Sequence, residues 1–212
     1  MQKIMFNDKY GLQRAAIDGT KPMTRRAVHD KWQTTLTEIF EDCNYDYSKF
    51  WQISDVQFIT NEKAPYKVGE VVAIAQSYKD AGYTKEWVVQ NVNPNPNAKP
   101  TDPFEKRYPG WNNKMFVKAE FMPNFIQFTD LKVERLKDIS DEDCLREGII
   151  PKKLDYTPAG YPKGLTYYGF YGWGVVSDHA KDAFAALIDK VSGRGTWDKN
   201  PWVFAYSFEL VK

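Results

Sequence analysis

The strongest constraint on the fold lies at the end of the chain. From Trp202 to Leu210 every second residue is large and apolar, and the residues between them are smaller or polar. A period of two is that of a β-strand, whose successive side chains point to opposite faces. Because one face is uniformly large and apolar, we expect this strand to occupy a central position in a small closed sheet.

The rest of the chain mixes helical and extended patterns. The predicted helices are a short one between Asp8 and Gly19, one over 29–40, a short one after Ser140, and one from Ser177 or Asp178 to Gly193. The predicted strands cover 3–6, 23–28, 71–78 and 126–136. A change of apolar phase within 126–136 predicts a bulge near Thr129 and Asp130. Without a regular βαβ rhythm, these elements indicate an α+β fold.

Bulk composition excludes several classes of protein. The 212 residues carry 29 Lys and Arg against 28 Asp and Glu, a net charge of +1, which excludes a polycation and an acidic tail. No run of about 20 apolar residues could cross a membrane, and the N-terminus lacks the long apolar stretch of a signal peptide. The two cysteines, Cys43 and Cys144, form no paired motif. We therefore expect a cytoplasmic protein with no membrane partner.

The sequence gives little support for a metal site or a bound cofactor. The only two histidines, His29 and His179, are isolated, and we expect both at the surface or at helix ends. With so few nitrogen and sulfur ligands, we expect no metal site, and we predict no cofactor.

Aromatic residues are unusually frequent, at 16% of the chain. Many flank the Asn- and Pro-rich segment 91–100 or lie in the Gly-rich segment 150–174. Such rings can stack on a planar ligand, or they can simply cover the core. The sequence leaves both readings open.

The segment Gly19–Arg26 concentrates three cations and a hydroxyl after a helix end. A lysine beside a threonine hydroxyl can act as its base when burial lowers the lysine pKa, so Lys21 and Thr24 are candidate catalytic residues. Arg25 and Arg26 could instead grip a phosphate, since arginine matches phosphate oxygens. A solvated turn with surface charges is the third reading.

Glu147 stands out among the acidic residues that follow Ser140. Carboxylates in the first turn of a helix favour its dipole, but a carboxylate in the last turn is mildly unfavourable. Glu147 occupies that last turn. Its position suggests a partner, either Lys21 or an arginine.

These motifs together resemble the ASCH domain family of the PUA-like superfamily. Gly19-x-Lys21-x-x-Thr24-x-Arg26 resembles the opening motif of that family, and Lys67-Val68-Gly69-Glu70 resembles its turn into a core strand. The segment from Thr129 to Ile149 and the ending Gly195-Thr196-Trp197-Asp198-x-Asn200-Pro201-Trp202-Val203 resemble phage-associated members. The resemblance implies one domain over 1–212, a small PUA-like β-barrel with flanking helices and insertions near 41–65, 80–115 and 150–175.

The family includes a bacterial acetylcytidine amidohydrolase. By resemblance, Thr24 would be the nucleophile, Lys21 its base, and Glu147 an acid, base or positioning group. Arg26 would stabilise negative charge, and we place Gly19, Arg25, Arg26 and Tyr78 in the substrate-binding set.

Three functions remain open on these grounds. The first is recognition of a nucleoside with hydrolysis of an acyl group from a cytidine-like substrate. The second is a non-catalytic module that binds RNA or a nucleotide. The third is a protein-interaction module whose aromatic insertions form the contact. We therefore expect a nucleoside or RNA as partner.

Overall fold

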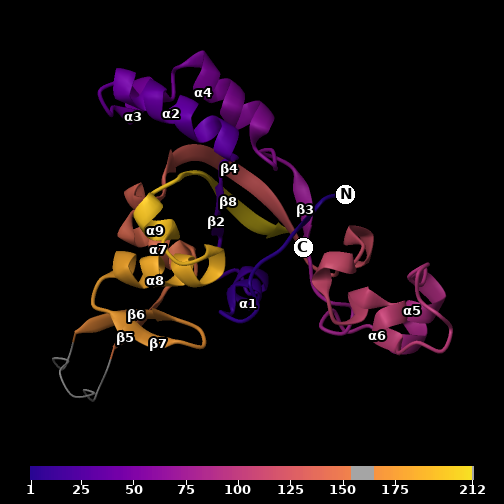
Figure 1. Cartoon of the computed structure of the whole chain (residues 1–212). Coiled ribbons are helices and arrows are strands. Elements are labelled where there is room, and N and C mark those ends of the chain that lie inside the picture. Colours follow the sequence, from indigo (N-terminus) through magenta and orange to yellow (C-terminus); the bar gives the residue numbers. More distant parts are fainter. Residues whose placement is uncertain (154–164, 212) are drawn as a thin grey trace. The chain divides into compact units, whose positions relative to one another are not determined.

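The computed structural model describes residues 1–153 and 165–211, which form two compact units (Figure 1). Unit 1 comprises Met1–Phe6, Val71–Gln127 and the C-terminal residues from Leu210. Unit 2 comprises Asn7–Glu70 and Phe128–Glu209. The insertion predicted near 80–115 belongs to unit 1, and those predicted near 41–65 and 150–175 belong to unit 2.

Unit 1 is built on three short strand segments. β1 (Lys3–Ile4) pairs in parallel with β3 (Val71–Ile74), and β3 pairs antiparallel with the first residues of β4 (Phe125–Arg135). The β-branched run that starts at Val71 therefore forms the predicted strand, which ends at Ile74 rather than at Tyr78.

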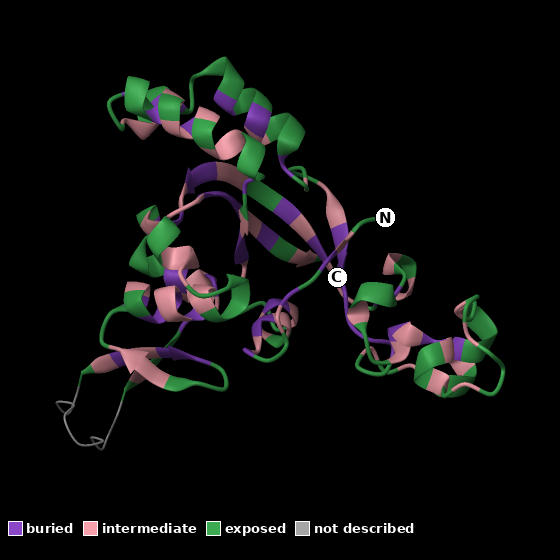
Figure 2. Ribbon diagram, viewed as in Figure 1, coloured by how far each residue is buried: buried purple, intermediate pink, exposed green. Residues whose placement is uncertain are grey.

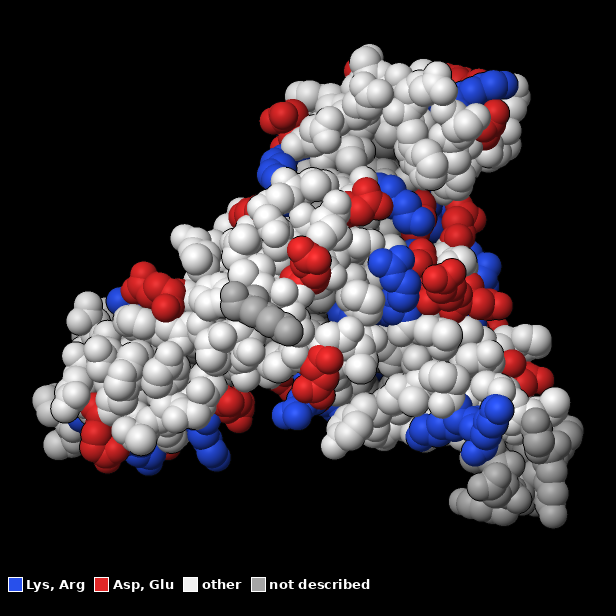
Figure 3. Space-filling model, turned by 180° about the vertical axis from the view of Figure 1, so that it is seen from behind, with Lys and Arg blue, Asp and Glu red and all other residues white. Residues whose placement is uncertain are grey.

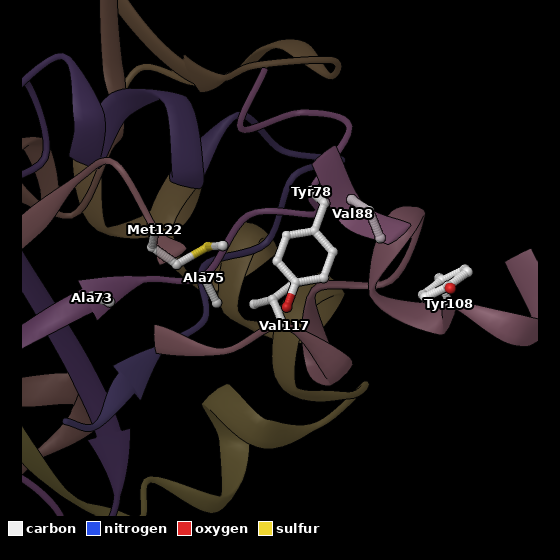
Figure 4. Close-up of a cluster of buried hydrophobic side chains, with 7 residues drawn as sticks. All are labelled: Ala73, Ala75, Tyr78, Val88, Tyr108, Val117 and Met122. Carbon is white, nitrogen blue, oxygen red and sulfur yellow. The ribbon is translucent and has the colours of Figure 1, made fainter. Parts of the chain in front are cut away.

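The Asn- and Pro-rich insertion folds onto this strand with its own small core. Its helical segments are α5 (Lys85–Asn91), α6 (Phe104–Arg107), η2 (Pro109–Trp111), η3 (Lys114–Phe116) and η4 (Ala119–Phe121). Seven buried side chains form the centre of this core: Ala73, Ala75, Tyr78, Val88, Tyr108, Val117 and Met122 (Figure 4). Trp87 packs against this cluster and stacks on Tyr83, with ring centroids 3.9 Å apart. The aromatic residues of this insertion are thus packing residues of unit 1.

Unit 2 contains the remaining strands of the main sheet. β2 (Met23–Ala27) pairs antiparallel with β8 (Trp202–Val211), so that Arg25 lies opposite Ala205. The order of the five strands is β1-β3-β4-β8-β2. The central position predicted for the last strand is confirmed, because β8 lies between β4 and β2.

The closed barrel expected for this sheet is not present. In the described part of the chain, β1 and β2 end the strand order and do not pair with each other, so the sheet is open. Closure requires the first and last strands to be hydrogen-bonded. The fold is a mixed α+β structure, as the alternation of elements predicted.

Helices complete unit 2, and most of their boundaries follow local signals. They are α1 (Leu12–Ile17), α2 (Asp30–Asp42), α3 (Tyr47–Phe50), α4 (Ser54–Phe58), the π-helix η1 (Ile59–Lys63), η5 (Leu136–Asp138), α7 (Asp141–Arg146), α8 (Ala180–Ser192) and α9 (Thr196–Lys199). The Ser140 hydroxyl accepts a hydrogen bond from the Asp143 amide and so caps α7. His29 and His179 occupy the N-cap positions of α2 and α8, which confirms their placement at helix ends.

A second sheet lies in unit 2 and consists of β5 (Ile150–Lys153), β6 (Thr166–Phe170) and β7 (Gly174–Ser177). Both pairings are antiparallel, and α8 packs against β6 and β7. Part of the aromatic segment predicted near 150–175 thus forms strands, whereas Tyr156 and Tyr161 lie outside the described residues. Burial is concentrated in β2, β3 and β8 of the main sheet, while the helices expose their outer faces (Figure 2).

Candidate functional site

Lys21 is the most unusual buried residue of unit 2. It follows α1 after the turn at Gly19, and only 2% of it is exposed. Its Nζ donates hydrogen bonds to the Glu147 carboxylate at 2.5 Å, to the Glu147 carbonyl at 2.8 Å and to the Met23 carbonyl at 2.7 Å. An ammonium group has three N–H donors, so these three acceptors satisfy it.

Glu147 is held at the end of α7, where its amide donates to the Asp143 carbonyl. One carboxylate oxygen accepts from Lys21, and the other accepts from Nη1 of Arg25 at 3.1 Å. Both pairs are buried. The partner predicted from the position of Glu147 in the last turn is therefore confirmed, and it is both Lys21 and an arginine.

Arg25 joins this pair to two further carboxylates. Its Nε and Nη2 lie 2.9 and 2.6 Å from Oε1 of Glu134, and Nη2 lies 3.1 Å from Asp143. Burial alone would lower the pKa of Arg25, but Glu147 and Glu134 outweigh it and raise that pKa. We call Lys21, Arg25, Glu134, Asp143 and Glu147 the ion cluster.

The ion cluster has a cationic rim. Lys132, on β4, places Nζ 2.8 Å from Glu134 and 3.7 Å from Asp143, and Arg146 places Nη1 3.1 Å from Asp143. Both rim side chains are about one third exposed. Buried charges are tolerated when each is paired and hydrogen-bonded, and the rim cations help to balance the three carboxylates.

The electrostatics of Lys21 suit proton exchange. Burial lowers the pKa of its amine below the usual range, the charge and hydrogen bond of Glu147 oppose this shift, and the two neighbouring arginines add to it. Moving one proton from the ammonium to the carboxylate would give a neutral amine in contact with a carboxylic acid. The pair can therefore supply a base and an acid side by side.

Thr24 and Arg26 lie on the other face of β2. Thr24 is opposite Tyr206 in the β2–β8 ladder, and alternation places it on the face away from Met23 and Arg25. Thr24 is buried, whereas Arg26 is half-buried. The charge of Arg26 acts on the phenols of Tyr66 and Tyr206 and tends to lower their pKa values, although burial raises both.

Rings cover this second face. Tyr66 stacks on Phe128 with centroids 4.9 Å apart, and Tyr206 lies 4.9 Å from Phe128. The structure thus brings Lys21 and Glu147 together, as the resemblance implied, but it directs the Thr24 side chain to the aromatic face. The reason is the alternation of side chains along a strand, which separates residues 23 and 25 from residues 24 and 26.

The other predicted binding residues occupy different surroundings. Arg25 directs its guanidinium into the ion cluster, with 1% of the side chain exposed. Gly19 is exposed after α1, has a φ of 75° and donates its amide to the Ala16 carbonyl. Tyr78 is fully buried in unit 1, where its hydroxyl accepts from the Lys118 amide at 3.1 Å.

Sequence reasoning missed Glu134 and treated Asp143 only as a favourable charge at a helix start. Glu134 lies in the buried second half of β4, next to Val133. The neighbouring Lys132 and Arg135 are also charged, so the local pattern did not distinguish Glu134 from a solvent-facing residue.

An apolar pocket of about 460 Å³ lies beside the Lys21–Glu147 pair. Thr20 and Gly148, the chain neighbours of these two residues, both line it. Gly148 has a φ of 105°, and a Cβ at that position would lie 3.1 Å from Leu12 of the pocket wall and 3.7 Å from Cδ of Lys21. Lys21 and Glu147 do not themselves line the pocket, and Gly148 lies between it and the aliphatic part of the Lys21 side chain.

Comparison of the chain with protein-family models, with curated proteins and with solved structures finds no significant match in any of the three. Among the described residues, no group of three or more His, Cys, Asp or Glu side chains could hold a metal ion. None of the helices in residues 1–153 and 165–211 is long and apolar enough to span a membrane.

Proposed function

We propose that unit 2 is a PUA-like module that recognises a nucleoside, and that its Lys21–Glu147 pair removes an acyl group from a cytidine-like base. The observation that carries this proposal is the 2.5 Å contact between Lys21 and Glu147, which are 126 residues apart in sequence. The resemblance to the ASCH family assigns a catalytic role to the same two residues. The contact, its burial and the adjacent pocket support that role.

The reaction is the hydrolysis of an amide on the exocyclic nitrogen of the base. With the proton on Glu147, the neutral Lys21 amine accepts a proton from the attacking hydroxyl group. The oxygen of that group bonds to the acyl carbon, the carbon–nitrogen bond breaks, and Glu147 protonates the departing amine. When water attacks, this completes the hydrolysis. Attack by Thr24 requires that its hydroxyl first reach the Lys21 side of β2. The product is then an acyl ester on Thr24, which water must cleave in a second step.

A second candidate function is non-catalytic binding of a nucleotide. It is favoured by the placement of Arg26 near Tyr66, both half-buried, on the face of β2 that also carries the buried Thr24. The Tyr66 ring can stack on a base, and the Arg26 guanidinium matches a phosphate. In this reading the ion cluster is structural, because the three donors of Lys21 are already bonded within the protein.

The deciding experiment is incubation of the protein with N4-acetylcytidine and separation of the released cytidine by chromatography. Lys21→Met and Glu147→Gln remove the two members of the pair, and Lys31→Met, an exposed lysine at the start of α2, is the matched control. The proposal predicts release by the wild type and by Lys31→Met. It predicts a loss of at least about 100-fold in kcat for the two pair variants, the usual scale of acid–base catalysis. Thr24→Ala then identifies the nucleophile, because only attack by Thr24 requires its hydroxyl.

Absence of release by the wild type would reject the hydrolase. Calorimetric titration with cytidine monophosphate would then test the second candidate. That candidate predicts weaker binding by Arg26→Met and unchanged binding by Lys31→Met. If neither release nor binding occurs, both functions are wrong.

A further inference from the structure

A second concave site in unit 2 lies along β4, away from Thr20 and Gly148. Its volume is about 370 Å³, and Trp51, residues 56, 57, 60 and 61, and residues 130–133 line it. We call it the Trp51 pocket. Five of its described lining residues belong to the segment near 41–65, which has no counterpart in the ASCH resemblance, and the other four belong to β4. The proposed hydrolysis assigns this pocket no role.

Trp51 is held rigidly in the wall of this pocket. Its indole N–H donates to the Val133 carbonyl at 3.0 Å, and its ring stacks on Tyr47 with centroids 5.2 Å apart and planes inclined by 28°. Even so, Trp51 is 42% exposed. An aromatic ring that is fixed yet open to solvent forms a ready platform for another planar group, because little side-chain freedom is lost when the group stacks.

The π-helix η1 also contributes to the lining of this pocket. π-Helical turns are rare and occur frequently at functional sites. In η1 the Thr60 hydroxyl donates to the Val56 carbonyl, and Thr60 and Asn61 both line the pocket. Each π-turn takes up an extra residue, which changes the direction of the side chains that follow it.

Polar groups with unused hydrogen-bonding capacity accompany the ring. Asp130 is exposed, and within residues 1–153 and 165–211 its carboxylate makes neither an ion pair nor a hydrogen bond. In the same described part, the Asn61 side-chain amide makes no hydrogen bond. A carboxylate accepts from an amino group, and an amide can both donate and accept, which is how proteins read the edges of bases.

We propose that the Trp51 pocket binds a nucleobase that carries an exocyclic amine, as cytosine, adenine and guanine do. The base stacks on the Trp51 indole, and its amine donates to Asp130. The ligand is a free nucleoside or nucleotide rather than RNA, because the described lining of the pocket contains a single cation, Lys132, which is paired with Glu134, and therefore no basic strip. On the face shown in Figure 3, Lys and Arg side chains likewise lie among Asp and Glu. The site does not depend on hydrolysis at Lys21 and Glu147.

The test follows the indole N–H resonance of Trp51 in 1H–15N spectra of the full chain, identified by its absence in Trp51→Phe. Cytidine, uridine and a short oligocytidine are titrated separately. We expect cytidine to shift this resonance and to bind more tightly than uridine, which lacks the amine. Trp51→Ala should weaken cytidine binding by about 5- to 150-fold, the range that one base–aromatic stack supplies, and Trp51→Phe should weaken it less.

Two matched controls accompany these variants, and calorimetric titration supplies the affinities. Asp130→Asn should remove the preference for cytidine over uridine, whereas Asp55→Asn, an exposed carboxylate on α4, should keep it. Trp173→Ala, at another exposed tryptophan, should bind cytidine as the wild type does.

The proposal is overturned if no nucleoside shifts the Trp51 resonance, or if Trp51→Ala and Asp130→Asn bind as the wild type does. Binding of the oligonucleotide alone, with strong salt dependence, would overturn the choice of a free nucleoside. Lys21→Met separates the two proposals, because it should abolish acyl release and leave the Trp51 shift intact.

Discussion

The most direct consequence of the ion cluster is the cost of removing one member of its central pair. In Glu147→Gln, the Lys21 ammonium keeps the carbonyls of residues 23 and 147 as acceptors, but it loses the carboxylate 2.5 Å away. Because the two side chains are only 2% and 6% exposed, solvent screens this loss little. Breaking such a pair costs about 3–5 kcal/mol, which at a typical m-value of about 2 kcal/mol per M lowers the urea midpoint by about 2 M.

The assay is urea unfolding followed by circular dichroism, arranged as a double-mutant cycle with Lys21→Met. Lys21→Met/Glu147→Gln removes both charges, so its loss of stability should be smaller than the sum of the two single losses by about 1–3 kcal/mol. The exposed pair Arg14–Asp18 is the control, and Asp18→Asn should unfold near the wild-type midpoint. Strict additivity in the cycle, or a Glu147→Gln midpoint equal to that of the wild type, would refute this account of the pair.

The remaining predictions concern pH, backbone strain and thiol chemistry. Burial lowers the pKa of Lys21 in the folded state below the ordinary value of 10.5, so between these two pKa values the unfolded chain binds more protons than the folded one. In urea titrations, wild-type stability relative to Lys21→Met should therefore rise with pH within that interval. A pH-independent difference would contradict this. Gly148→Ala should lower the free energy of unfolding more than Gly193→Ala does. Both positions have positive φ, but only the added methyl group at 148 meets Leu12 and Lys21. Equal urea midpoints for the two variants would show that these contacts do not destabilise the fold. Burial raises the pKa of Cys144 to about 12, so its thiol should be alkylated only after the protein unfolds, as mapped by mass spectrometry. Alkylation of Cys144 in the native protein as fast as in the unfolded protein would argue against this burial.

The two faces of β2 explain why the motif Gly19–Arg26 supported several interpretations. Arg25 faces the carboxylates of the ion cluster, whereas Arg26 faces the tyrosines. Two adjacent arginines therefore meet opposite environments, one buried and fully paired, the other half-buried beside rings. The proposed hydrolysis would use the first face and the alternative nucleotide binding the second, so variants of Lys21 and Arg26 separate the two proposals.

Local signals predicted most of the secondary structure. Ser140 and Gly193 marked helix ends because capping and positive φ depend on single residues. The short helices α3 and α4 were not predicted, since helices of one turn have little apolar periodicity. The Asp46 side chain, which caps α3, is the local signal that was available.

Closure of the sheet could not be predicted from strand patterns. The alternation from Trp202 to Leu210 indicated a central strand, and it is equally compatible with an open sheet and a barrel. Whether the outermost strands meet depends on twist, strand length and the path of the connections, and none of these has a sequence period.

The sequence by itself determined the α+β composition, the central last strand, the helix-end histidines and the need of Glu147 for a cationic partner. Periodicity, caps and the helix dipole act over a few residues and can be read along the chain. Only the tertiary structure decided that Glu147 meets both Lys21 and Arg25, that Glu134 joins them, and that Thr24 faces the aromatic side. It also decided that Tyr78 is buried in unit 1 whereas Trp51 stays exposed in unit 2. These outcomes depend on contacts between residues that are often more than 100 positions apart, which packing alone brings together.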